Sequence, residues 1–307
     1  MTENKVFEEK IEGTTNIESY KLVTNDLVRE ALENDKGQDA QLLSWEIKPF
    51  TKKGDNYASI VACIEVKYHK IETEFIDSFV AKINPLRPPN FDIMEIYARE
   101  PVILSSIIGG MDKQLANLKL NNIRTPKVLS RNNEKGKEVF IEENLRNQGF
   151  KMHNRKIGLD LNHSLLVVNE IGRFHASSIL FEEEIYPKTL SETFPDFKCI
   201  LLSHLRLNIL TTTKHGKYSV TSRYTSKRNW MDPELSSFEI LSSLFTEGAE
   251  KARNFAQKAG PKYEKGEKWL SKPSQEIINI YFDVFSPKKP FDVLIHGDCW
   301  TNNMLFK

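Results

Sequence analysis

The first half of the chain changes, after a polar start, to the alternation of apolar and polar positions that is typical of β-strands. The strands are predicted at residues 45–50, 57–68, 74–85, 126–130 and 138–144. A turn-rich segment with Gly54, Asp55 and Asn56 at its tip joins the first two runs. We therefore expect a mainly antiparallel sheet.

Helical spacing appears on either side of the first three predicted strands. A short helix is expected between Thr24, which can cap it, and Gly37, which follows its end. Its apolar positions are Leu27, Val28, Ala31 and Leu32. A second helix is expected over much of residues 91–118, where Pro101 should kink or restart it and Gly109-Gly110 should break it.

The second half of the chain follows a helical period. The segment 159–180 places Leu161, Leu165, Val168, Ile171, Gly172 and His175 on one stripe. Further helices are predicted at 194–210, 233–256 and 274–286, followed by a short strand at 291–298. A sheet followed by helices predicts an α+β protein with two lobes and a cleft between them.

The predicted lobes divide the chain at residue 142. The N-terminal lobe, 1–142, would consist of a helical extension over 1–44 and then the sheet with its inserted helix. The C-terminal part, 143–307, would hold the connection between the lobes and the helices.

Composition narrows the class of protein. The 307 residues are 39% hydrophobic and 28% charged, with a net charge of +1, as in an ordinary globular protein. This balance gives no basic field for nucleic acid or an anionic membrane, so we expect neither partner, and nothing indicates an obligate protein partner. The three cysteines, Cys63, Cys199 and Cys299, have neither metal-ligand spacing nor an even number for disulfides. With no signal peptide pattern and no long apolar run, we expect a cytoplasmic protein.

The last predicted strand ends at residues that could take part in catalysis. Asp298 follows its apolar residues and Asn303 lies five positions further on, the spacing of a kinase catalytic loop. Asp298 could accept the proton of an attacking hydroxyl, and Asn303 could ligate a phosphate-bound Mg²⁺. In this interpretation His296 braces the loop and Gly297 permits its turn. The alternative is an ordinary surface loop.

A lysine inside an apolar strand is the second chemical signal. An unpaired ammonium at Lys82 would be costly there, whereas a kinase-type strand lysine binds phosphates and pairs with a helix glutamate. Glu95 and Glu100 are the candidates for that partner. The alternative is that Lys82 extends along a strand edge to solvent.

Weaker signals surround these residues. The loop at 52–59 has one glycine, a poor match to a glycine-rich phosphate loop, although Asn56, Ser59 and nearby N–H groups are candidates for nucleotide binding. The segment 140–145 leads from a strand toward the helical part, where adenine would meet backbone groups. A lone helical histidine such as His175 is more often a core residue than a catalytic one.

Taken in order, six segments resemble the ecdysteroid kinase-like family of arthropods, which is related to choline kinases and aminoglycoside phosphotransferases. The segments are "GDNYAS", "FVAKINP", "YAREPVIL", "FIEENLRNQGF", "NRKIGLDLNHSLLVVNEIGRFHASS" and "VLIHGDCWTNNMLFK". The similarity spans residues 54–307, and Trp300 with Asn302-Asn303 matches the family's habit closely. The resemblance implies a protein-kinase-like two-lobed fold and an ATP- and Mg²⁺-dependent kinase.

The resemblance also assigns roles by position. It implies that Asp298 is the catalytic base, that Asn303 is a magnesium ligand and that Lys82 contacts the phosphates. Glu100, in the family's "RE" position, would pair with Lys82. The adenine hinge would run from Glu143 to Leu145, where this chain has Glu143-Asn144-Leu145 and the family more often has Glu-Asp-Leu. The phosphate acceptor would be a hydroxylated small molecule, such as the steroid alcohol of an ecdysteroid.

The sequence stops before one element of the family pattern, an Asp-Phe-Gln segment whose aspartate chelates Mg²⁺. We therefore expect the C-terminal lobe to be incomplete at Lys307 and this fragment alone to be inactive. Two alternatives to the steroid kinase stay open at this stage. One is a catalytically inactive nucleotide- or lipid-binding protein, and the other is a choline- or aminoglycoside-type kinase.

Overall fold

A computed structural model describes residues 18–50, 59–86, 100–194, 236–273, 276, 279–280, 293–294, 296, 299 and 301–307. Its strands are β1 (Gln41–Pro49), β2 (Ile60–Lys70), β3 (Thr73–Ile83), β4 (Val128–Asn132), β5 (Val139–Glu143), β6 (Lys151–Met152) and β7 (Leu305–Phe306). Its α-helices are α2 (Asn25–Lys36), α4 (Ile108–Asn117), α5 (Leu161–Ile185), α6 (Leu190–Thr193), α7 (Ser236–Ala259) and α8 (Glu264–Leu270).

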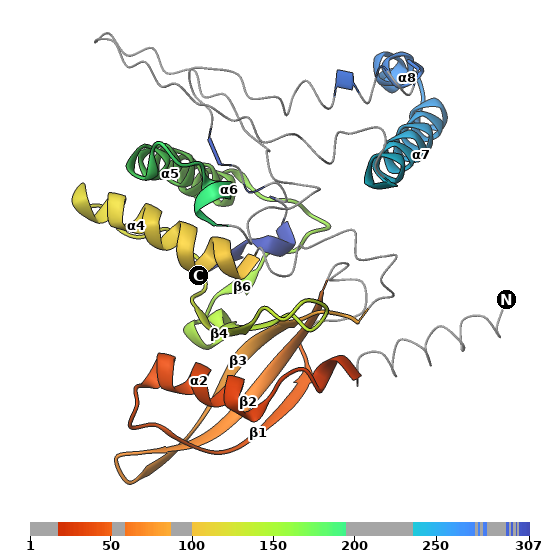
Figure 1. Ribbon diagram of the computed structural model, residues 1–307. Helices are drawn as coiled ribbons and strands as arrows, with labels where there is room; N and C mark the ends of the chain where they lie inside the picture. Colours follow the sequence, from red (N-terminus) through yellow and green to blue (C-terminus); the bar gives the residue numbers. More distant parts are fainter. Residues whose placement is uncertain are drawn as a thin grey trace, which may run out of the picture.

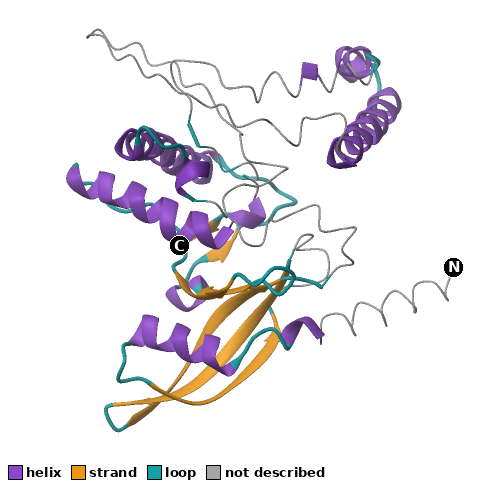
Figure 2. Ribbon diagram, in the orientation of Figure 1, coloured by secondary structure: helices purple, strands orange, loops and turns teal. Residues whose placement is uncertain are grey.

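The first five strands form one antiparallel sheet in the order β1-β2-β3-β5-β4 (Figures 1 and 2). Because every neighbouring pair is antiparallel, the pattern of five short alternating runs predicted this architecture correctly. The labelled helices of the second half lie apart from this sheet in Figure 1, so the α+β, kinase-like division into a sheet region and a later helical region is confirmed.

Helix α2 covers one face of the sheet. Thr24 caps it by accepting from the Leu27 N–H, and Gly37 follows its end, as the sequence predicted. The four apolar positions of its stripe are buried in the core. Two side chains also fasten α2 and β4 together: Asn34 donates to the Leu129 carbonyl and Ser130 donates to the Leu27 carbonyl. Strand β1 begins at Gln41, so the predicted helical extension to residue 44 was too long at this end.

The alternation of strand side chains divides the residues of β3 and β5 between two faces. Phe79, Ala81 and Ile83 of β3 and Val139 and Ile141 of β5 pack into the core with α2. The residues between them, Lys82 included, therefore point to the opposite face of the sheet. The cluster around Lys82 described below lies on this face and not on the face that α2 covers.

Helix α4 contradicts one prediction, because it runs straight through Gly109-Gly110, which we expected to break it. It follows a π-helical turn, Ile103–Ile107, and packs against α5. A Cβ atom on Gly110 would lie 2.2 Å from Cε2 of Phe181 on α5. The absence of a side chain at Gly110 therefore allows close helix packing, which outweighs the poor helix propensity of glycine.

The predicted apolar stripe of α5 is only partly buried. Leu161, Leu165 and Val168, in its first half, are more than half exposed. The second half carries the packing: His175 and Phe181 are buried, and Phe181 belongs to a cluster that joins α5 to α4. A 3.6-residue repeat identifies the helix, but it does not show which part of the helix packs against another element.

The predicted strand at 291–298 is not seen where the structure describes this stretch. Val293 and Leu294 are buried but lie outside regular strands. The Leu294 N–H donates to the Ser178 hydroxyl of α5 at 3.1 Å, so a helix side chain takes the place of a strand partner. Further on, β7 pairs with β6 through Lys151–Phe306 and Met152–Leu305.

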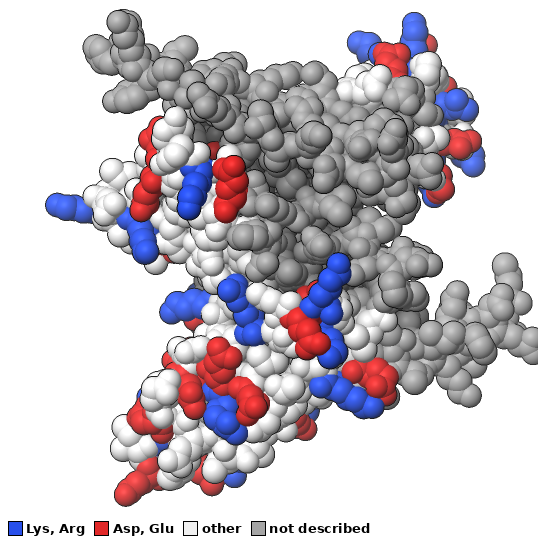
Figure 3. All heavy atoms as spheres, viewed as in Figure 1, with Lys and Arg blue, Asp and Glu red and all other residues white. Residues whose placement is uncertain are grey.

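Helix α7 confirms the predicted helix at 233–256, whereas α8 was not predicted. The predicted helix at 194–210 lies almost wholly outside the described residues, as does most of that at 274–286. Among the residues that the structure describes, no helix is long and apolar enough to cross a membrane. On the face in Figure 3, basic and acidic side chains of these residues are interspersed. The division of the chain at 142/143 stays a prediction.

Candidate functional site around Lys82

The structure brings together a strand lysine and a helix glutamate. Strand β3 carries Lys82 on the sheet face opposite α2, and Glu100 begins the described helical turn that leads into α4. The Lys82 ammonium lies 2.5 Å from Oε1 of Glu100. The Lys82 side chain is 22% exposed, so it does not extend freely into solvent from a strand edge.

A second carboxylate, Glu142 of β5, also reaches Lys82. In the β3–β5 register Lys82 lies opposite Phe140 and Val80 lies opposite Glu142, so all four residues share one face. Oε1 of Glu142 is 3.3 Å from the ammonium, which also lies 5.4 Å above the Phe140 ring. The other oxygen, Oε2, is buried and has no hydrogen-bond partner in the described part of the chain.

Burial and charge act in opposite directions on this cluster. Burial lowers the pKa of Lys82, but the negative charges of Glu142 and Glu100 outweigh it and hold that pKa above its ordinary value. Burial raises the pKa of Glu142, and the neighbouring ammonium offsets only part of this effect. Lys82 therefore stays cationic, while Glu142 resists ionisation more than an exposed glutamate does.

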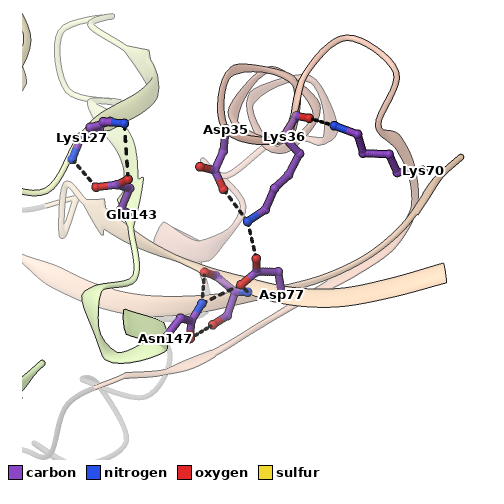
Figure 4. Close-up of polar contacts among 8 residues, drawn as sticks. Asp35, Lys36, Lys70, Asp77, Lys127, Glu143 and Asn147 are labelled. Carbon is purple, nitrogen blue, oxygen red and sulfur yellow. Dashed lines mark hydrogen bonds and ion pairs between the residues drawn. The ribbon is translucent and has the colours of Figure 1, made fainter. Parts of the chain in front are cut away.

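The predicted adenine hinge follows β5 directly. The Glu143 carboxylate accepts from the Lys127 N–H at 3.1 Å, and the Glu143 N–H donates to the Lys127 carbonyl at 3.0 Å. Figure 4 shows the Glu143 side chain directed toward Lys127. Leu145 begins a 3₁₀ helix, Leu145–Gln148, whose N-cap is Asn144. The side chain and N–H of Glu143 are thus engaged within the fold, which leaves main-chain groups beyond it as candidates for base recognition.

A polar network fastens this hinge to β3. Asn144 donates to the Ser78 hydroxyl at 2.8 Å, and Asn147 donates to Asp77 at 2.6 Å and to the Ser78 carbonyl at 3.1 Å. Asp77 in turn lies 2.5 Å from the Lys36 ammonium at the end of α2 (Figure 4). The network therefore connects the hinge, the central strand and α2.

Lys36 sits between two acids, because Asp35 is 2.9 Å away on the other side. Burial lowers the pKa of Lys36, but hydrogen bonds to Asp77 and Asp35 outweigh it and raise that pKa above its ordinary value. Its carbonyl also accepts from Lys70. The charge network is thus built around a permanently protonated lysine.

The remaining predicted site residues are placed only in part. Ser59 is half-buried immediately before β2, and Asn303 ends a 3₁₀ turn, Thr301–Asn303, just before β7. Asn56 and Asp298 lie outside the described residues, as does Glu95. His175 is buried, and burial lowers its pKa, which suits a core histidine. The roles assigned to the predicted site residues stay predictions.

Glu142 and Asn147 were not predicted from the sequence. The signal for Glu142 was available: it lies two residues from Phe140, and a strand alternates, so Glu142 shares the face of Phe140 and not that of Ile141. Which face of β3 would meet it depends on the strand register, which one sequence does not state. Asn147 gave no local signal, because its partners lie about 70 residues away in sequence.

An antiparallel sheet with a central-strand lysine, paired to a glutamate from a following helix, is the arrangement of the N-terminal lobe of kinase-like proteins. Comparison with family models gives the particular group. The ecdysteroid kinase-like family model matches residues 53–199 and 212–307, and the chain belongs to this family. Membership places it among kinase-like proteins and indicates small-molecule phosphotransfer. No curated protein and no solved structure gives a significant match to the chain.

Proposed function

We propose that this protein is an ATP- and Mg²⁺-dependent small-molecule kinase that phosphorylates a hydroxyl group. The observation that carries the proposal is the Lys82–Glu100 ion pair at 2.5 Å. A buried cation held by a helix carboxylate is what kinases use to orient the α- and β-phosphates of ATP. The proposed acceptor is a steroid alcohol such as an ecdysteroid.

Each site residue has a part in this proposal. Lys82 binds phosphate oxygens, while Asn56 and Ser59, before β2, contribute to the phosphate loop. The hinge from Glu143 to Leu145 binds adenine through main-chain groups. Asp298 accepts the proton of the acceptor hydroxyl, which makes its oxygen a better nucleophile.

The donor chemistry of Asn303 fits a hard cation, because an amide oxygen is an ordinary ligand for Mg²⁺. When bound, Mg²⁺ neutralises charge on the β- and γ-phosphates. Asn303 would hold it beside the phosphates that Lys82 orients. Phosphoryl transfer depends mainly on such positioning and charge stabilisation.

A second candidate function is nucleotide binding without catalysis. Its specific support is Glu142, a second carboxylate 3.3 Å from the Lys82 ammonium. When Glu142 is ionised, the three side chains carry a net charge of −1, which repels a triphosphate. A weaker hold on the phosphates would leave nucleotide binding without the positioning that phosphoryl transfer requires.

The first experiment measures ATP binding by isothermal titration calorimetry, with and without Mg²⁺, in wild type and Lys82→Met. The matched control is Lys67→Met, in which a half-exposed lysine of β2 paired to Glu74 is removed from the same sheet. We expect Lys82→Met to weaken ATP binding at least about tenfold, since it removes a charge-assisted phosphate contact. Lys67→Met should bind ATP as wild type does. Equal affinities in all three proteins would remove the basis of the proposal.

The second experiment separates catalysis from binding. With the complete protein, transfer of the γ-phosphate is followed with a panel of hydroxylated steroids, choline and an aminoglycoside as acceptors, in wild type and Asp298→Asn. Turnover of a steroid that is lost in Asp298→Asn while ATP binding persists supports the kinase. ATP binding without turnover of any acceptor supports the second candidate, and normal turnover by Asp298→Asn excludes the assigned base.

A further inference from the structure

Two histidines and an aspartate meet at the start of α5. His153 follows β6, Asp160 is the N-cap of α5, and His163 lies in its first turn. Each side chain offers one atom that could bind a metal ion, and these three atoms all lie within 4.8 Å of one another. The two imidazole rings are 4.6 Å apart between centroids and inclined by 60°.

Helix capping accounts for part of this geometry. Oδ1 of Asp160 accepts from the His163 N–H at 2.9 Å, which is an ordinary N-cap bond. Its other oxygen, Oδ2, is 2.9 Å from Nδ1 of His163, so the ring is held against the carboxylate. The hydrogen bond from the His163 N–H, with a smaller contribution from the ring, holds the pKa of Asp160 below its ordinary value.

Capping does not account for His153. Its Nδ1 atom is buried and has no hydrogen-bond partner within the described residues. A buried ring nitrogen without a partner is costly, and such atoms are normally satisfied by protein, water or an ion. The His153 ring lies beside the His163 ring, and an ion coordinated by Nδ1 of His153 would satisfy this nitrogen.

The surroundings are suited to a bound ion. Phe306 of β7 lies edge-on to His163, with centroids 4.6 Å apart, and forms an apolar wall beside the ring. The Asp160 side chain is 58% exposed, so an ion has access from solvent. Since β6 pairs with β7, His153, which directly follows β6, lies near Phe306 of β7, with ring centroids 6.4 Å apart.

We propose that His153, Asp160 and His163 form a binding site for a divalent transition-metal ion of the Zn²⁺ class. Two imidazole nitrogens and one carboxylate suit Zn²⁺, whereas Mg²⁺ and Ca²⁺ prefer oxygen ligands throughout. Bonds of about 2.0–2.2 Å to a tetrahedral ion place ligand atoms roughly 3.4 Å apart, so these side chains need shifts of no more than about 1.5 Å. Three protein ligands leave one position for water or another donor.

The test titrates chelator-treated full chain with Zn²⁺ by calorimetry, and with Co²⁺ by visible absorption, at pH 7.5. We expect one equivalent to bind, with a Co²⁺ spectrum of low coordination number. His153→Ala and His163→Ala should each weaken binding by more than the approximately 10–100-fold typical of losing an outer-shell partner.

Three further variants make the result specific. Asp160→Asn keeps a good N-cap but removes the carboxylate, so it should weaken binding while α5 stays folded. Cys299→Ser and His69→Ala remove other potential ligands and should bind as wild type does. Should His163→Ala fail to fold, His153→Ala decides the matter, because His153 lies outside the helix.

Two outcomes would overturn the proposal. One is the absence of stoichiometric Zn²⁺ binding to the wild-type chain. The other is binding that His153→Ala and Asp160→Asn leave unchanged, which would assign the ion to another place. Neither outcome depends on ATP or on turnover, so the test is independent of the kinase proposal.

Discussion

The Ser178 hydroxyl of α5 accepts a hydrogen bond from the Leu294 N–H, 116 residues further along the chain. Both groups are buried, and the same hydroxyl donates to the His175 carbonyl one turn earlier in the helix at 2.8 Å. Ser178 therefore fixes the height at which the segment leading to Asp298 lies along α5. At Leu294, the segment that leads to the predicted catalytic loop is therefore held by a helix side chain and not by a strand neighbour.

Ser178→Ala should destabilise the protein by about 1–3 kcal/mol, because it leaves the buried Leu294 N–H without a partner. The matched control is Ser177→Ala, since Ser177 is also buried but donates only within its own helix, to the Phe174 carbonyl. Urea unfolding followed by circular dichroism gives both values. Equal losses in the two variants would mean that the long-range bond is unimportant.

The two adjacent glycines of α4 should respond oppositely to alanine. A Cβ at Gly110 would lie 2.2 Å from the Phe181 ring, so Gly110→Ala should cost about 1–3 kcal/mol of stability through overpacking. No atom lies within 4 Å of a Cβ built at Gly109, so Gly109→Ala should gain about 0.5–1 kcal/mol from helix propensity. Thermal unfolding of the pair tests this, and a shift of the same sign in both would contradict the packing of α4 on α5.

Glu142→Gln should make the protein more stable at neutral pH and tighten ATP binding. Because burial raises the pKa of Glu142, the folded state favours its protonated form. The stability that this group contributes is complete below pH 4.5, its unperturbed pKa, and is lost as pH rises through the folded value. Glutamine mimics the neutral form and escapes that loss.

The measurement for Glu142 is the difference in unfolding free energy between variant and wild type across pH 5 to 8, together with ATP affinity at pH 7.5. The stability gain should shrink toward acid pH. A variant that is less stable than wild type at pH 8 would show instead that the Lys82–Glu142 attraction outweighs the cost of burial.

His175 should make stability fall in mild acid. Burial lowers the pKa of His175, so the unfolded chain binds its proton more readily than the folded protein does. The contribution is complete above pH 6.5, the unperturbed value, and is lost as pH falls through the folded value. His175→Gln should therefore show a shallower decline between pH 7.5 and 5.

The wild type and His175→Gln are compared by urea unfolding at several pH values, with a chelator present so that no ion binds the histidines near α5. Parallel declines in the two proteins would show that other groups control the acid response.

Much of the fold could be predicted from the sequence, because the patterns that indicate its elements are local. The cap at Thr24, the stripe of α2 and five alternating strands each depend on residues within a few positions of one another. Lys82 was conspicuous for the same reason, as a charge inside an apolar strand. The family resemblance then named Glu100 as its partner, and the structure places the two in contact.

What only the tertiary structure decided depends on contacts between distant segments. The register of β3 on β5 put Glu142 beside Lys82. The close approach of Phe181 explains why a glycine stands at position 110 within a continuous helix. Asn147 met Asp77, and His153 met His163, through packing that no periodicity records. The sequence by itself determined the elements and the kind of chemistry, because propensity and alternation act locally. The neighbours of each charged side chain were decided by strand register and helix packing, which are properties of the whole fold.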